Sequence, residues 1–384
     1  MKVIVSAGGT GGHIYPALAI INKLKEKHRN CEVLYIGTTD RMEATLVPSL
    51  GIKYKGIPMK GLNRKNIFKN VSVLKSFNAA INRAKEIISE FKPDIVLGIG
   101  GYITAPVILA AHKLGVKTFI HEQNSIPGLS NKILKRYADV VGVSLKDSMK
   151  YFKGANVVFT GNPRSEEAAF AKPVKKSKYD LSDSKKLVLF VMGSLGSLTI
   201  TNIMKDIIPS FKNKDYEVLF VTGKNYFESY KDVKIPNNVK MVPNLDDMLS
   251  VLKKTDLIVT RAGASTIAEI TSVGIPALMI PSPYVTHNHQ EKNAKVLEDN
   301  NCAIVIKEKE VTKEILIKNI DDLLSDKDKL QSMKKNSKKM GVIDSATKIV
   351  EIIEDLVNGE KNDWCNKIYR RLWHRKISRK CQHG

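Results

Sequence analysis

Short apolar runs alternate with amphipathic stretches along most of the chain. In the first half, the apolar runs predict seven strands at Lys2–Ser6, Glu32–Gly37, Lys53–Ile57, Ile95–Gly98, Lys117–His121, Val140–Val143 and Val157–Thr160. In the second half, they predict six strands at Leu187–Met192, Glu217–Thr222, Val239–Val242, Leu257–Thr260, Ala277–Pro281 and Ala303–Ile306. Apolar strands that alternate with helices indicate α/β architecture, with parallel sheets covered by helices on both faces.

Apolar residues spaced three and four apart predict helices between these strands. The first helix has a buried face made of Ile14, Ala17, Leu18, Ile21 and Leu24. Asp40 and Glu43 have the spacing of a capping box and predict the start of the second helix. Further helices are predicted at Val71–Phe91, Thr199–Phe211, Asp246–Lys254, Ser265–Val273, Gln290–Asp299, Thr312–Leu324, Lys327–Lys339 and Asp344–Leu356.

The alternation is interrupted once, by the polar stretch Arg164–Lys186, which predicts a linker region. With 384 residues, the chain is long enough for two domains. Two doubly wound domains place the loops after their strands around a shared cleft. The predicted boundaries are 1–163 and 164–340, then a helix at 341–358 that packs back towards the first domain, then a basic tail at 359–384.

A glycine-rich turn, "GGTGGH", separates the first strand from the first helix. Glycines let backbone N–H groups approach a ligand, and the helix start adds unpaired N–H groups and partial positive charge. Such a turn suits a phosphate, although a tight turn without any ligand stays an alternative. A second glycine turn, Met192–Ser197, opens the second half in the same way.

The charge balance is unusual, because 62 Lys and Arg residues face 39 Asp and Glu residues and give a net charge of +23. Such a chain favours polyanions, either nucleic acid or anionic lipid. Between Glu43 and Glu86 there are nine bases, interleaved with apolar residues, and no acid. This mixture is typical of a membrane-surface patch, with a solvated loop and helix as the alternative. No nucleic-acid-binding motif is present, so no nucleic-acid partner is predicted.

The remaining composition argues against several classes of site. The four cysteines form no C-x-x-C pair, which argues against a disulfide framework and a zinc site. His287 and His289 stand in an "HNH" run, but no acidic cluster accompanies them. The apolar run 95–111 is too short for a membrane span and is broken by Gly100, Gly101 and Pro106. We therefore expect no membrane-spanning segment, no cofactor and no required metal.

Seven segments together resemble one family in order and spacing: "GGTGGHIYPALAI", "GIGGYITAPVILAA", "HEQNSIPGLSNK", "GNPR", "GSLGS", "TRAGASTIAEI" and "PSPYVTHNHQEKNA". The chain resembles the MurG-type N-acetylglucosaminyltransferases of bacterial cell-wall synthesis over about residues 1–357. The resemblance implies a GT-B fold, with two Rossmann-like domains facing an interdomain cleft. It implies transfer of GlcNAc, with inversion, from UDP-GlcNAc to the C4 hydroxyl of the muramoyl sugar of lipid I, which gives lipid II.

The resemblance also implies roles for residues at the strand ends. His13 is the candidate general base, and Glu122 and Tyr102 are expected beside it in catalysis. The residues implied in substrate binding are Thr10, Gly11, Gly12, Asn124, Arg164, Ser194, Leu245, Ala264, Ser265, Thr266, Glu269 and Gln290. No metal would be needed, because helix N-termini and Arg164 would neutralise the leaving diphosphate.

Within this set, the resemblance assigns individual contacts to the donor. Asn124 would contact the donor sugar, and Gln290 would bind the GlcNAc hydroxyls. Arg164 and Ser194 would bind the diphosphate, and the helix start at 264–266 would face the diphosphate and ribose. Glu269 would accept the ribose hydroxyls, and the backbone of Leu245 would contact uracil.

The resemblance also implies where in the cell the enzyme acts, and two alternative functions stay open. The segment Lys60–Phe77 is expected to touch an anionic phospholipid surface, at the cytoplasmic face of the bacterial membrane. Met192 stands where the family often has glycine, and the tail beyond Gly359 has no family counterpart. The alternatives are a glycolipid synthase with a diacylglycerol-type acceptor, and a basic binding module without catalysis.

Overall fold

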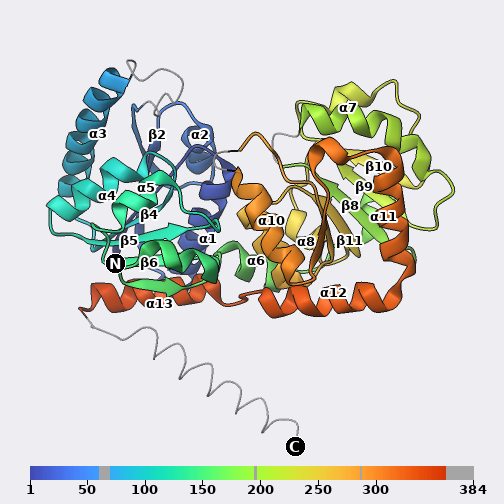
Figure 1. Cartoon of the computed structure of the whole chain (residues 1–384). Coiled ribbons are helices and arrows are strands. Elements are labelled where there is room, and N and C mark those ends of the chain that lie inside the picture. Colours follow the sequence, from blue (N-terminus) through green and yellow to red (C-terminus); the bar gives the residue numbers. More distant parts are fainter. Residues whose placement is uncertain (60–69, 194–196, 286–287, 360–384) are drawn as a thin grey trace, which may run out of the picture. The chain divides into compact units, whose positions relative to one another are not determined.

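The computed structural model describes residues 1–59, 70–193, 197–285 and 288–359, with the side chains of 70–74 excepted. The chain divides into two compact units (Figure 1). The first unit contains Met1–Gln123, Pro127–Pro163 and the segment that begins at Ala346. The second unit contains Arg164–Ser345 and a short excursion from the first half, Asn124–Ile126.

The first unit is built on a seven-stranded parallel sheet, in the order β3-β2-β1-β4-β5-β6-β7. Its strands are β1 Lys2–Ala7, β2 Glu32–Thr38, β3 Lys53–Ile57, β4 Ile95–Gly100, β5 Lys117–Glu122, β6 Val140–Val143 and β7 Val157–Phe159. The helices are α1 Gly11–Lys27, α2 Met42–Ser49, α3 Asn70–Phe91, α4 Thr104–Lys113, α5 Leu129–Leu134, η2 Lys146–Phe152 and α13 Ser345–Val357. Apolar residues of α1 and α13 cover one face of the sheet, and those of α3 and α4 cover the other.

The second unit is built on a six-stranded parallel sheet, in the order β10-β9-β8-β11-β12-β13. Its strands are β8 Leu187–Val191, β9 Glu217–Val221, β10 Val239–Val242, β11 Leu257–Thr260, β12 Ala277–Met279 and β13 Ala303–Val305. The longer helices are α6 Arg164–Phe170, α7 Leu198–Ile207, α8 Met248–Leu252, α9 Ala264–Val273, α10 His289–Asp299, α11 Lys313–Ser325 and α12 Lys327–Met340. The short 3₁₀ turns are η3 Lys176–Tyr179, η4 Ile208–Phe211, η5 Phe227–Tyr230 and η7 Glu308–Glu310.

The predicted fold class is confirmed, because both sheets are entirely parallel and carry helices on both faces. In each sheet the first strand lies beside both its second and its fourth strand, so the order reverses at β1–β4 and at β8–β11. Ligands of open α/β sheets bind beyond the strand ends at such reversal points. The cleft expected between the two halves stays a prediction.

Two local predictions are wrong. The charged stretch at 164–186 is not a plain linker, because it begins with α6, whose first residue Arg164 is ion-paired with Glu167 and Glu269. Asp40 does not cap the second helix, whose N-cap residue is Arg41, without a side-chain cap bond. In both cases, a contact with residues distant in sequence outweighs the local pattern.

The last described helix belongs to the first unit. The residues Ile349, Val350, Ile352 and Ile353 of α13 are buried in the core that includes α1. At the end of α1, Lys27 Nζ lies 2.5 Å and His28 Nε2 lies 2.7 Å from the two carboxylate oxygens of Glu354. The apolar face of this helix therefore completes a core whose other members all lie more than 180 residues earlier in the chain.

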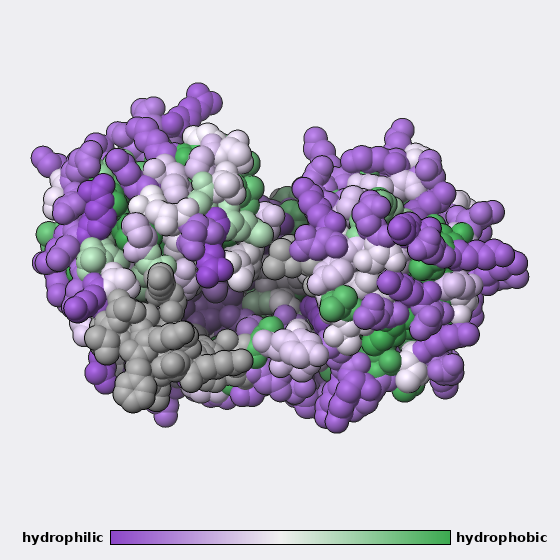
Figure 2. All heavy atoms as spheres, turned by 90° about the horizontal axis from the view of Figure 1, so that it is seen from above, coloured by the Kyte–Doolittle hydropathy of each residue, from purple (hydrophilic) through white to green (hydrophobic). Residues whose placement is uncertain are grey.

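The described surface of the molecule is largely polar. Hydrophilic side chains cover most of the face that Figure 2 shows. None of the helices in the described ranges combines the length and the apolar character that crossing a bilayer demands.

Candidate active site

Three neighbouring strands of the first sheet end beside one another. β1, β4 and β5 are adjacent in the sheet, and their last residues are Ala7, Gly100 and Glu122. Because the strands are parallel, the loops that follow them meet at one edge of the sheet. This edge therefore gathers the glycine-rich turn, Tyr102 and the loop that begins at Gln123.

The glycine-rich turn and the loop after β4 are in close backbone contact. Gly8 N donates a hydrogen bond to Gly100 O at 3.1 Å. Gly101 has φ +91°, and a Cβ on this residue would collide with the carbonyl group of Gly8. Gly100 has φ +124°, and a Cβ there would lie 2.5 Å from Cδ2 of His13. Only glycine meets both demands, backbone conformation and space, at these two positions.

We expect Gly101→Ala to destabilise the first unit by about 3–5 kcal/mol, the sum of a strained φ and a backbone collision. Gly115→Ala is the matched control, because Gly115 has φ +70° and a Cβ added to it would meet no atom within 4 Å. That change should cost only about 1–2 kcal/mol. Chemical denaturation of both variants measures the difference, and equal costs would mean that the two loops are not packed as described.

The side chain of a buried glutamate binds the backbone of the glycine-rich turn. Glu43 is fully buried, and its Oε2 accepts a hydrogen bond from Gly9 N at 3.1 Å. Its Oε1 accepts from Thr38 N at 3.2 Å and from Thr38 Oγ1 at 2.8 Å. A buried carboxylate is stable only when its oxygens are satisfied in this way. Sequence reasoning missed this role and took Glu43 for a capping residue, because the contact with Gly9 joins residues that are 34 positions apart.

His13 lies in the first turn of α1, half-buried, beside Gly100. Its Nδ1 lies 3.1 Å from the carbonyl oxygen of Gly8, and a carbonyl oxygen only accepts hydrogen bonds. In the neutral ring Nδ1 therefore carries the hydrogen, and Nε2 carries the lone pair. The three residues before it, Thr10 as N-cap with Gly11 and Gly12, complete a turn that has no acidic side chain.

His121 contrasts with His13. It is fully buried, and its Nε2 lies 3.0 Å from Gly161 O and 3.1 Å from Thr160 Oγ1. Burial lowers the pKa of His121 to about 4, so the ring is neutral near pH 7. A ring enclosed in this way has a structural role and does not reach a substrate.

Glu122 and Tyr102 lie at the same edge and are engaged with the chain itself. Glu122 is 2% exposed, and its Oε2 accepts from Asn131 Nδ2 at 2.9 Å and from Gly128 N at 3.1 Å. These bonds fix the loop between β5 and α5. Tyr102 is half-buried, and its hydroxyl lies 3.5 Å from Met59 O. The structure thus gives Glu122 a positioning role in this loop.

In the second unit, α9 starts directly after β11, at the reversal point of the sheet. Gly263 is its N-cap, and the predicted residues Ala264, Ser265 and Thr266 form its first turn. The first turn contains no acidic side chain. Backbone N–H groups and the helix dipole therefore give this end partial positive charge, which suits a phosphate group.

Arg164 and Glu269 lie next to each other on α6 and α9. Arg164 Nε donates to Glu269 Oε1 at 2.8 Å, and Nη1 donates to Glu167. The side chains of Arg164 and Glu269 are 17% and 12% exposed. Burial raises the pKa of Glu269 even though Arg164 opposes that rise. Burial also acts against the charge of Arg164, but Glu269 and Glu167 outweigh it and raise the pKa of this guanidinium. Both groups are thus held by each other in a largely buried position.

A residue that the sequence did not single out, Asn293, anchors the short excursion 124–126 in the second unit. Asn293 is fully buried, and its Oδ1 accepts from Ser125 N at 3.0 Å and from Ser125 Oγ at 2.8 Å. Its Nδ2 donates to Asn124 Oδ1 and to Ala262 O, both at 3.3 Å. Asn293, on α10, therefore orients the side chain of Asn124. In the sequence, Asn293 is only one asparagine on an amphipathic helix, which does not indicate this role.

The other predicted donor contacts are placed as follows. Gln290 lies in the first turn of α10, and its Oε1 accepts from Ser282 N at 2.8 Å. Leu245 follows β10 and is buried in the core of the second unit. Ser194 lies outside the described residues, as do Lys60, Arg64, Lys65 and Lys69 and the tail at 360–384.

Within the described ranges, no three His, Cys, Asp or Glu side chains gather as metal ligands would.

Known proteins match the chain over most of its length. Residues 3–143 match the glycosyltransferase family 28 N-terminal domain, and residues 187–349 match the glycosyltransferase family 28 C-terminal domain. A Bacillus cytotoxicus protein named UDP-N-acetylglucosamine--N-acetylmuramyl-(pentapeptide) pyrophosphoryl-undecaprenol N-acetylglucosamine transferase is 44% identical over 362 residues, which cover 93% of this chain and all of that protein. The Listeria monocytogenes protein of the same name is 43% identical, over 92% of this chain and 99% of its own. The crystal structure of Acinetobacter baumannii MurG superposes with a TM-score of 0.74 at 27% identity and covers 92% of this chain and 99% of its own.

Proposed function

This chain belongs to glycosyltransferase family 28, and from that premise we infer the reaction and the part that each residue takes in it. The protein transfers N-acetylglucosamine from UDP-N-acetylglucosamine to the N-acetylmuramyl-pentapeptide of pyrophosphoryl-undecaprenol, as the names of its relatives state for them. The product is the lipid II of peptidoglycan synthesis. We propose that the accepting group is the C4 hydroxyl of the muramoyl sugar and that the anomeric carbon is inverted.

The second unit is proposed to bind the donor. The N-terminal turn of α9 faces the diphosphate, and Arg164 adds a fixed cation beside it. Arg164 Nε binds Oε1 of Glu269, and Oε2 is the oxygen proposed to accept a ribose hydroxyl. Gln290 and Asn124 select the sugar through its hydroxyls, and Asn293 holds Asn124 in place. As the bond between the sugar and the diphosphate breaks, these groups stabilise the charge that develops on UDP.

His13 is the proposed general base in the first unit. The observation that carries this proposal is its hydrogen bond to the carbonyl oxygen of Gly8, which leaves Nε2 as the basic nitrogen. Nε2 takes the proton of the acceptor hydroxyl while that oxygen attacks the anomeric carbon. A positioned base of this kind contributes typically about 10²–10⁴-fold to a rate.

We propose that no metal takes part, because helix N-termini and Arg164 supply the positive charge. The test is transfer of radiolabelled GlcNAc from UDP-GlcNAc to a short-chain lipid I analogue, with and without a chelator. We expect equal rates of transfer in the two reactions. A loss of transfer in chelator that Mg²⁺ restores would refute the metal-free mechanism.

The same assay separates the remaining alternatives for the acceptor. A diacylglycerol acceptor offered in place of the lipid I analogue should receive no GlcNAc. If UDP binds but neither acceptor is glycosylated, the chain is a binding module and the proposed reaction is wrong.

The place of action is proposed to be the cytoplasmic face of the membrane, where the lipid-linked acceptor lies. The supporting observation is the basic and apolar composition of Lys60–Phe77, which favours an anionic phospholipid surface. Most of this segment lies outside the described residues, so the proposal depends on sequence alone.

A further inference from the structure

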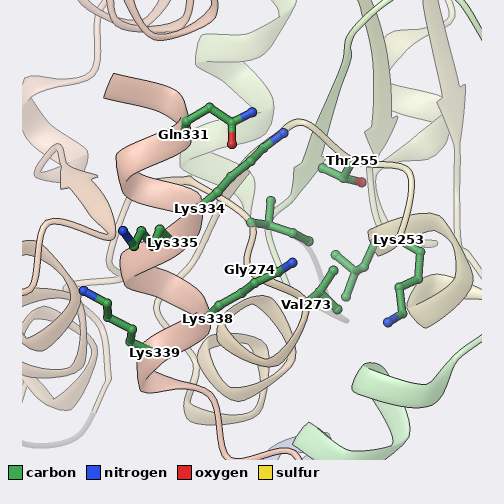
Figure 3. Close-up of a pocket in the computed structure, with 11 residues that line it drawn as sticks. Lys253, Thr255, Val273, Gly274, Gln331, Lys334, Lys335, Lys338 and Lys339 are labelled. Atoms are coloured by element: carbon green, nitrogen blue, oxygen red, sulfur yellow. The ribbon is translucent and has the colours of Figure 1, made fainter. Parts of the chain in front are cut away.

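A pocket of about 620 Å³ lies in the second unit, away from the candidate active-site residues (Figure 3). It is lined by the ends of α8 and α9, by the residues just before β11 and β12, and by α12. Thr255 precedes β11 and Gly274 ends α9, so the pocket lies at the amino ends of the parallel strands. The ten residues of α9 separate it by about 15 Å from the helix start proposed for the donor.

Five lysines line this pocket: Lys253, Lys334, Lys335, Lys338 and Lys339. In Figure 3, Lys334 and Lys338 extend from α12 towards the strand ends, and Lys253 lies across the pocket from them. Lys335 and Lys339 extend from the other side of α12. Lys334 Nζ is 3.5 Å from Asp256 Oδ1, and Lys253 donates to Ala169 O. For Lys335, Lys338 and Lys339, the described part of the chain offers no ion-pair partner.

The lysines of the pocket therefore outnumber the one carboxylate that is paired with them, that of Asp256. Burial lowers the pKa of Lys253, and the positive charge of Lys338 lowers it further. α12 carries six lysines and a single acid, Asp328, which lies at its other end. Crowded cations repel one another, and an anion between them removes that cost.

One glycine also makes room for a lysine of the pocket. Gly274 has φ +82°, and a Cβ on it would collide with the side-chain stem of Lys338. The stem of Lys338 thus packs directly over the end of α9, and its position is fixed by the backbone rather than by an ion pair. This contact directs the side chain of Lys338, which is exposed, along the lining of the pocket.

We propose that this pocket binds a small polyanion that carries two or more phosphate groups. Lysine ammonium groups bind phosphate as compact point charges, and Thr255 and Gln331 add polar groups to the lining. The volume falls within the range of about 300–1,000 Å³ that is usual for small-molecule sites. The phosphates come either from a soluble compound or from lipid headgroups, which share this chemistry.

The first test is lysine footprinting of the full chain by acetylation and mass spectrometry, with inorganic tripolyphosphate as probe. Saturating UDP occupies the donor site during the reaction. We expect acetylation of Lys334 and Lys338, which extend into the pocket, to slow, while Lys327 and Lys329 at the start of the same helix react as before. Unchanged rates at both pocket lysines with this probe would exclude a soluble polyphosphate as the ligand.

The second test is a double variant, Lys334→Gln and Lys338→Gln, which removes the two ammonium groups that extend from α12 into the pocket. Its affinity for tripolyphosphate should fall about tenfold or more. The matched control is Lys335→Gln and Lys339→Gln, which loses the same charge from exposed positions on the other side of the same helix. An equal loss in the control would mean a general charge effect and would overturn the pocket. If the double variant does not fold, Lys338→Gln replaces it, with Lys339→Gln as its control.

A vesicle arm distinguishes the two sources of phosphate. Phosphatidylglycerol vesicles replace tripolyphosphate in the footprint, and phosphatidylcholine vesicles serve as the uncharged control. Protection by tripolyphosphate alone assigns a soluble ligand, and protection by phosphatidylglycerol assigns lipid headgroups. Absence of protection with both probes would refute the proposal, and none of these results depends on glycosyl transfer.

Discussion

Replacing His13 with alanine is expected to lower the turnover number by about 10²–10⁴-fold and to leave the affinity for UDP-GlcNAc unchanged. The reason is the division of roles between the two units. The ring of His13 lies at the strand ends of the first sheet, with its lone pair on Nε2, whereas the proposed donor contacts lie in the second unit. Removing the ring therefore removes the proton acceptor and leaves the donor site intact.

Two measurements together check this expectation. Single-turnover transfer to a lipid I analogue reports the chemical step, and calorimetric titration with UDP-GlcNAc reports donor affinity. His112→Ala is the matched control, because His112 is an exposed histidine in the same unit, at the end of α4. Turnover of His13→Ala at the level of the control would exclude His13 as the base.

Glu269→Gln is expected to weaken UDP binding by about tenfold or more, since a hydrogen bond to a charged group is worth about 1.5–3 kcal/mol. The glutamine keeps the shape of the side chain but loses the negative charge that attracts the ribose hydroxyl. The same change removes a partner of Arg164, so the direct effect must be separated from an effect through that arginine.

Two controls achieve this separation. Glu167→Gln removes the other carboxylate that binds Arg164 and leaves Glu269 in place. Calorimetry with UDP and with 2′-deoxy-UDP then compares the variants. If Glu269 contacts the ribose, the preference for UDP over 2′-deoxy-UDP disappears only in Glu269→Gln. An equal loss of affinity in Glu167→Gln, with the preference retained, would contradict the ribose contact.

The parallel sheets were predictable because buried strands are short, apolar and regularly spaced. Leu257–Thr260, for example, is predicted and observed with the same ends. Loop positions followed from the strands, since a glycine turn after a parallel strand lies at the carboxyl edge whatever its neighbours are. The close contact between Gly101 and Gly8 was not predictable, because it joins two loops that are about ninety residues apart.

Residues whose partners are distant in sequence were the ones misread or missed. Glu43 has a capping pattern locally, but its carboxylate is occupied by Thr38 and Gly9. The charged residues around Arg164 resemble a linker until Glu269 supplies a partner on another helix. Asn293 has no local signal at all, because its role is defined only by the excursion 124–126 that it holds. The roles assigned to the predicted site residues remain predictions that the variants above test.

The return of α13 to the first unit has a consequence for biosynthesis. A ribosome that adds about 5–20 residues per second needs about 10–40 s to proceed from the last strand of the first sheet to the end of this helix. During that interval the nascent first half presents the apolar face of α1 and its sheet without the side chains of Ile349, Val350 and Ile353. The first unit can therefore complete its core only after the second half of the chain has been synthesised, and a premature stop before Ala346 leaves a polypeptide that exposes an aggregation-prone surface.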